Sequence, residues 1–152
     1  KPVLGICLGA QLVARSAGAT NILGRPTEFG WHYVRPTAAG RADPVLGHLG
    51  AGSPLFHWHS DTFTLPAHAE RLAESDMTEI QAFRLGRATY GIQFHFEADR
   101  SLVGRWSTDF ASVIAGIAPD WPQRHAADAD RFGAIADETG MAIARAWVGL
   151  MR

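Results

Sequence analysis

The stretch Pro2-Val3-Leu4-Gly5-Ile6-Cys7-Leu8-Gly9, at the beginning of the chain, decides the fold. A short apolar run that opens with a proline is typical of a buried strand. Residues 8–17 are good helix formers, and Gly18 favours the end of a helix there. A strand, a tight turn and a helix therefore follow one another directly, and this order predicts an α/β fold.

The rest of the chain divides into a middle part of short strands and a helical end. Gly and Pro punctuate the middle part, whereas the apolar residues after Glu97 recur at three-and-four spacing. The expected strands are two between residues 22 and 37, then 54–59, 71–74, 79–85 and 89–96, with a hairpin turn at 86–87. We expect a loop over 38–53 with one helical turn near 45–49, and two amphipathic helices over 102–117 and 132–150, separated by a break at 119–122.

Composition excludes several classes of protein. The chain has 152 residues, 47% hydrophobic residues and a formal net charge of −1, which argues against a basic nucleic-acid surface and against a disordered chain. No apolar run is long enough to span a membrane, and no signal peptide is recognisable. The single cysteine, Cys7, excludes a disulfide within the chain and a multi-cysteine metal site. We expect one cytoplasmic domain that binds neither nucleic acid nor membrane.

Cys7 lies in the pattern Gly-x-Cys-x-Gly at the predicted turn from strand to helix. Such a turn is so sharp that side chains two residues before and after the nucleophile would collide with the backbone, so we expect both Gly5 and Gly9 to be required. The beginning of a helix favours a thiolate, and the backbone N–H of Leu8 can point at an oxyanion. The alternative, that Cys7 is a small core residue, is weakened by the two glycines.

A thiol nucleophile needs a base, and His95 is the best candidate among the seven histidines. It lies in Gln93-Phe94-His95-Phe96-Glu97, where a predicted strand ends in two ionisable residues. Residues i and i+2 of a strand point to the same face, so we expect Glu97 to accept a hydrogen bond from the His95 ring. Cys7, His95 and Glu97 then form a set of nucleophile, base and orienting group.

Two segments together resemble the class I (triad) glutamine amidotransferases: residues 2–11, read as Pro-Val-Leu-Gly-Ile-Cys-Leu-Gly-Ala-Gln, and residues 93–97. Within that family the chain is most similar to the branch that contains the glutaminase domain of GMP synthase. Residues 28–31, 56–63, 65–66 and 81–84 support this placement. The resemblance implies a flavodoxin-like fold, a mixed and mainly parallel sheet flanked by helices, with a nucleophile elbow.

The resemblance also implies a reaction and its residues. Cys7 would attack the side-chain amide of L-glutamine, His95 would protonate the departing ammonia, and water would hydrolyse the glutamyl thioester, with Glu97 orienting His95. Gln11 and the backbone around His59 and Ser60 match the family's substrate-binding segments. No cofactor or metal is implied, and the ammonia would pass to a synthetase partner.

The chain departs from the family pattern in three places. The usual His-Pro-Glu has Phe96 in its middle, no synthetase domain follows Arg152, and the family's first strands, with the second oxyanion donor, would precede Lys1. We therefore expect residues 1–152 to form a single amidotransferase-like domain that is incomplete at its N-terminus.

Three alternatives stay open. The absent synthetase domain motivates a stand-alone hydrolase of γ-glutamyl peptides or conjugates that uses the same triad. Phe96 and the missing start motivate a non-catalytic binding module of the same fold. The spacing of His57, His59 and Asp61 on one strand face also suggests a metal site, although no fourth ligand is evident.

Overall fold

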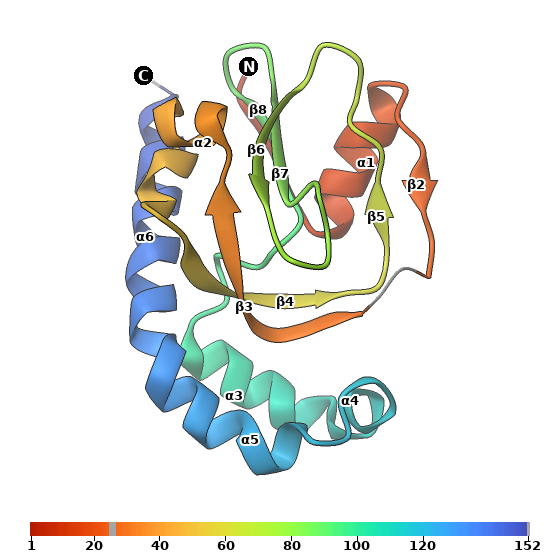
Figure 1. The fold of residues 1–152 in the computed structure, drawn as a ribbon, viewed down its shortest axis with the longest axis vertical. Helices are drawn as coiled ribbons and strands as arrows, with labels where there is room; N and C mark the ends of the chain where they lie inside the picture. The colour runs from red at the N-terminus through yellow and green to blue at the C-terminus, as the bar shows by residue number, and fades with distance from the viewer. Residues whose placement is uncertain (25–26, 152) are drawn as a thin grey trace.

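The structure is a computed structural model that describes residues 1–24 and 27–151. A six-stranded sheet, ordered β1-β8-β7-β6-β3-β4, forms its centre, and β2 and β5 make a separate two-stranded ribbon (Figure 1). The strands are β1 (Val3–Ile6), β2 (Asn21–Ile22), β3 (Glu28–Pro36), β4 (Ser53–His59), β5 (Thr62–Phe63), β6 (Glu70–Glu74), β7 (Ala82–Leu85) and β8 (Thr89–Ile92). The predicted α/β class with a mixed sheet flanked by helices is confirmed, although residues 25 and 26 of the expected strand region 22–37 lie outside the described residues.

The sheet is less parallel than we expected. Only β1 and β8 pair in parallel, and the other described pairs of the six-stranded sheet are antiparallel. The reason lies in the short connections, since Gly86 at φ 56° closes a tight hairpin between β7 and β8, whereas a parallel pair needs a long crossover. The single parallel pair is the one that carries Cys7 at its end.

Helices cover both sides of this sheet. Figure 1 shows α1 beside the β1–β8 edge, α6 along the opposite side, and α3, α4 and α5 grouped at one end near β3 and β4. The helical segments are α1 (Leu8–Ser16), α2 (Ala38–Ala42), the 3-10 turn η1 (Leu46–Leu49), α3 (Arg100–Asp109), α4 (Ala111–Ile117), α5 (Trp121–Asp128), the π-helical turn η2 (Ala129–Gly133) and α6 (Ala134–Gly149). In the described part of the chain no helix combines the length and the apolar character that a membrane crossing requires.

The predicted turn at 45–49 is confirmed as η1, but two other predictions about the helices were wrong. The expected loop over 38–53 contains α2, because the side chain of Thr37 accepts a hydrogen bond from the N–H of Gly40 at 3.0 Å and so caps a helix that composition alone disfavours. The closing region forms four helices rather than two, since Phe110 leaves helical geometry (φ −114°, ψ 24°) between α3 and α4, and α5 begins at Trp121.

An aromatic core joins the closing helices to the sheet. Phe29 of β3 packs edge to face against Phe56 of β4 at 5.6 Å and against Trp121 of α5 at 5.0 Å between ring centroids. The backbone of Phe56 also accepts a hydrogen bond from the N–H of His95 at 2.7 Å. Burial of these rings therefore fixes the strand that holds His95 in place.

Candidate active site

Cys7 occupies a strained backbone position between β1 and α1. Its φ of 49° and ψ of −107° lie outside the regions that a non-glycine residue adopts easily. A hydrogen bond of 2.8 Å from its N–H to the carbonyl of Ile92 ties this turn to β8. The predicted sharp elbow is thus present, and Leu8 is the first residue of α1, so the backbone N–H of Leu8 has no acceptor within the helix.

The two glycines of the elbow are not equivalent. A Cβ added to Gly5 would lie 2.4 Å from the carbonyl oxygen of Gly9, whereas a Cβ added to Gly9 would meet no atom within 4 Å. The expectation that both glycines avoid a collision was therefore wrong for Gly9. Gly5 is required because the first turn of α1 passes directly over it. The atoms that leave no room for a side chain at Gly5 belong to the backbone of Gly9, so this contact does not require a glycine at position 9.

His95 and Glu97 are paired, but not by the strand geometry that we expected. Strand β8 ends at Ile92, and His95 forms only an isolated bridge to Phe56 before the chain turns. In this turn Nδ1 of His95 lies 2.7 Å from Oε1 of Glu97. In this contact Nδ1 of His95 carries a proton and donates a hydrogen bond to the carboxylate of Glu97. Nε2 is therefore the ring atom that can accept a proton.

The electrostatic surroundings of His95 favour its charged form. Burial lowers the pKa of His95, but hydrogen bonds to Cys7 and Glu97 and the charges of both groups raise it, and the balance lies at about 9. The thiol and the carboxylate thus both favour the charged form of His95, and the role of the three residues in catalysis stays a prediction.

A cavity of about 320 Å³ opens beside Cys7. Of the predicted site residues, the structure brings Cys7, Leu8, Gln11, His59 and Ser60 together in its wall. His95 and Glu97 are not among the residues that line it, but a hydrogen bond to Cys7 is among the causes that raise the pKa of His95.

Sequence reasoning missed the apolar side of this cavity. Val113 and Ile117 of α4 line it, and both are partly exposed. Their three-and-four spacing predicted a helix facing the core, but Phe110 breaks that helix and turns α4 towards the cavity. No signal in the sequence distinguishes this orientation from ordinary core packing.

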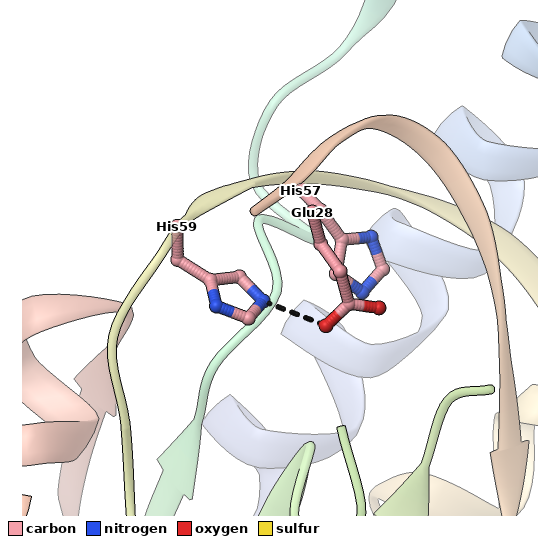
Figure 2. A group of neighbouring side chains, drawn as sticks. All are labelled: Glu28, His57 and His59. Atoms are coloured by element: carbon pink, nitrogen blue, oxygen red, sulfur yellow. Dashed lines mark ion pairs between the residues drawn. The ribbon is translucent and has the colours of Figure 1, made fainter. Parts of the chain in front are cut away.

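The side chain of His59 lies in a buried cluster with Glu28 and His57. Nε2 of His59 lies 3.2 Å from Oε2 of Glu28 (Figure 2), and its Nδ1 lies 3.1 Å from the carbonyl of Asp61. The antiparallel register of β3 and β4 sets this contact, because it places Glu28 directly opposite His59. His59 thus contacts Glu28 and also lines the cavity beside Cys7.

Burial and hydrogen bonds together set the charges in this cluster. Burial raises the pKa of Glu28, but hydrogen bonds with His59 and Ser75 lower it by more, so the net shift is downward. Burial lowers the pKa of His57 well below its ordinary value, more than Glu28 raises it. The cluster thus holds an ionised carboxylate beside a neutral His57.

The same cluster replaces the metal site that the spacing of His57, His59 and Asp61 suggested. Within the described residues, Glu28, His57 and His59 bring one ligand atom each to within 4.8 Å of one another, and no fourth His, Cys, Asp or Glu joins them. Asp61 points elsewhere and accepts a hydrogen bond from Gly24. Both oxygens of Glu28 already accept hydrogen bonds, from Ser75 at 2.6 Å and from Gln81 at 2.7 Å.

Comparison with known proteins gives consistent matches. The family model for glutamine amidotransferase class-I matches residues 1–106. The glutamine amidotransferase-like protein YfeJ of Salmonella typhimurium is 37% identical over 95 residues, which are 62% of this chain and 40% of YfeJ. The glutamine-hydrolyzing GMP synthase of Cytophaga hutchinsonii is 32% identical over 123 residues, which are 79% of this chain and 24% of that protein.

A solved structure is similar over almost the whole chain. A glutamine amidotransferase from Thermotoga maritima superposes with a TM-score of 0.73 at 27% identity and covers 99% of this chain and 60% of its own. The chain therefore spans less than two thirds of the length of each of these three relatives.

Proposed function

The chain belongs to the class-I glutamine amidotransferase family, and on this premise we propose that it hydrolyses the side-chain amide of L-glutamine and releases ammonia. One observation carries the proposal: Cys7 stands on a strained elbow at the edge of a cavity, next to a histidine that is paired with Glu97 at 2.7 Å. A nucleophile, a base and an orienting carboxylate in this order are what acyl transfer requires.

The reaction follows from these three groups. The thiolate of Cys7 forms a bond to the amide carbon of glutamine, and the carbonyl electron pair moves to oxygen, where the N–H of Leu8 stabilises it. The carbon–nitrogen bond then breaks, and the nitrogen leaves as ammonia with a proton from His95. Water, deprotonated by His95, hydrolyses the thioester and releases glutamate. Glu97 stabilises the imidazolium in both steps.

The cavity supplies the contacts that hold the substrate. Gln11 and the backbone at His59 and Ser60 line it within reach of Cys7. The amide of Gln11 and the backbone polar groups suit the α-amino and α-carboxylate groups of an amino acid. The buried Glu28 supports this segment from behind, because it contacts the ring of His59.

The fate of the ammonia is part of the proposal. Relatives named GMP synthase are longer than this chain, which spans about a quarter of the one from Cytophaga hutchinsonii. We propose that ammonia passes to a synthetase domain or subunit that binds at the open side of the cavity. Phe96 preserves the distance between His95 and Glu97, so the loss of the family's proline does not prevent the pairing.

A second candidate is the hydrolysis of γ-glutamyl peptides or conjugates. Leu8, Val113 and Ile117 give the cavity an apolar wall beside Cys7. Such a wall suits a γ-glutamyl amide with an apolar leaving group better than it suits the ammonia of glutamine.

Release of glutamate by the full-length protein tests both candidates, because hydrolysis of glutamine and hydrolysis of a γ-glutamyl peptide both produce it. We expect turnover of glutamine, alone or with a synthetase partner, and its loss in Cys7→Ser. Faster turnover of γ-glutamyl peptides than of glutamine would select the second candidate. If neither substrate turns over, and a glutamine-mimicking electrophile labels wild type no faster than Cys7→Ser, the protein is a non-catalytic module.

A further inference from the structure

Gln93 is a buried amide next to Cys7 to which neither the motif nor the proposed reaction assigns a role. It follows β8 and is fully buried, and its backbone N–H is held by the carbonyl of Gln81 at 2.8 Å. Its Nε2 lies 3.6 Å from Sγ of Cys7, within hydrogen-bond distance for sulfur. The side chain therefore touches the atom that would attack the substrate.

The surroundings determine which end of the Gln93 amide faces the sulfur. The carbonyl oxygen of Asp61 can only accept a hydrogen bond, so Gln11 must direct its Nε2 towards it, at 3.4 Å. The same nitrogen lies 3.2 Å from Oε1 of Gln93 and has a second proton to donate there. Gln93 consequently directs its oxygen to Gln11 and its nitrogen to Cys7.

We propose that Gln93 is a further catalytic residue, which donates a hydrogen bond to the Cys7 sulfur and stabilises the thiolate that attacks the substrate. An N–H donor favours a thiolate over a thiol, because the anion is the stronger acceptor. The hydrogen bonds from Gln11 to Asp61 and Gln93 also hold the side chain of Gln11 in one orientation. Its Oε1 is then free to accept a hydrogen bond from the substrate. The inference rests on the proposed function, because it requires Cys7 to be the nucleophile.

The contribution of Gln93 is separable from that of the charged groups around Cys7. These groups are His95, with Glu97 behind it, and His59 and Asp61 in the cavity wall. Each of them is titratable, whereas the amide of Gln93 is neutral at every pH. Removal of the amide should therefore move the curve of Cys7 alkylation rate against pH along the pH axis without changing the shape of the curve.

The test measures alkylation of Cys7 by iodoacetamide between pH 5 and pH 10, followed by mass spectrometry of the Cys7 peptide. In Gln93→Met, which keeps the side-chain length but has no donor, we expect the midpoint of the profile to rise by about one pH unit. We also expect an alkylation rate about ten-fold lower at a pH below both midpoints. The kcat for glutamine should fall by a similar factor, with a smaller change in KM.

Gln81→Met is the matched control. Gln81 is equally buried, but its amide binds Glu28 and Ser75, so its loss should leave the midpoint unchanged. If Gln93→Met does not fold, Gln11→Met removes the group that sets the orientation of Gln93 and should raise the midpoint by a smaller amount.

The outcomes distinguish this inference from the proposed function. An unchanged midpoint in a folded Gln93→Met protein, or in Gln11→Met where that variant replaces it, overturns the role of Gln93 even if wild type hydrolyses glutamine. If the midpoint rises in Gln93→Met but the wild type hydrolyses no γ-glutamyl substrate, the hydrogen bond to Cys7 is supported and the catalytic role of Gln93 is overturned. An equal shift in Gln81→Met would show a general loss of packing and would also overturn the inference.

Discussion

His95 with Glu97 and His59 with Glu28 are both histidine–carboxylate pairs near Cys7, but they lie in different surroundings. Glu97 has 38% of its side chain exposed, whereas Glu28 has 1%. The exposed carboxylate has one histidine partner at 2.7 Å, and the buried one is held by Ser75 and Gln81 as well.

The difference agrees with the chemical role proposed for the first pair and a supporting role for the second. Around His95, Cys7 and Glu97 raise the pKa to about 9 against the effect of burial, so that the ring can hold and release a proton next to the thiol. The carboxylate of the buried pair is held in place by hydrogen bonds from Ser75 and Gln81. Four substitutions, in order of decreasing effect, examine this division.

His95→Gln should have the largest effect. Removal of the base leaves Cys7 without a proton acceptor, and we expect kcat for glutamine to fall about a thousand-fold, with little change in melting temperature. Steady-state ammonia release and thermal unfolding measure the two quantities. Retention of more than a tenth of the wild-type kcat would assign the role of base to another residue.

Glu28→Ala should damage stability instead. It leaves His59, Ser75 and Gln81 with buried polar atoms that have lost their partner, and we expect the free energy of unfolding to fall by about 3 to 5 kcal/mol. Urea unfolding measures this loss, and Glu97→Ala is the matched control, with an expected loss below about 1 kcal/mol. Equal losses in the two variants would contradict the division between the pairs.

Glu97→Gln should reduce kcat about a hundred-fold, because the imidazolium of His95 loses its counter-charge. It also weakens a pH dependence of stability, to which the hydrogen bond of His95 with Cys7 contributes as well. Since the folded pKa of His95 is raised from 6.5 to about 9, its stabilising contribution is complete below pH 6.5 and is lost as the pH rises through 9. Between pH 6.5 and pH 9, the free energy of unfolding of the wild type should therefore fall by about 1 kcal/mol more than that of Glu97→Gln. This figure is reduced because Glu97 is partly exposed to solvent. Parallel stability curves from pH 6 to pH 9.5 would refute this.

Asp76→Ala should have the smallest effect. The ion pair between Arg35 and Asp76 is short, at 2.6 Å, but Asp76 is 83% exposed, and we expect a change within about 0.5 kcal/mol that decreases with added salt. Urea unfolding at low and high salt measures it. A loss comparable to that of Glu28→Ala would mean that distance, and not burial, decides the strength of these pairs.

The elbow and the histidine–carboxylate pair could be predicted because each is local. Gly5 and Cys7 lie two residues apart at one turn, and His95 and Glu97 lie two apart at another, so the chain itself limits their separation. The reason given for the second pair was nevertheless wrong, since a turn after β8 brings the two side chains together, not strand alternation. Helix α2 was missed because the single cap at Thr37 outweighs the unfavourable glycine at position 40.

By itself the sequence determined the strand-to-helix unit around Cys7, the α/β class and the pairing of His95 with Glu97. Only the tertiary structure decided that Glu28 lies against His59, that α4 lines the cavity and that Gln93 directs its nitrogen to the sulfur. The physical reason is distance along the chain. The register of β3 with β4 places Glu28 against His59, and the carbonyl of Asp61 orients Gln11 and through it Gln93. Such contacts depend on how elements far apart in the sequence pack together. Residue types and their spacing do not specify that packing.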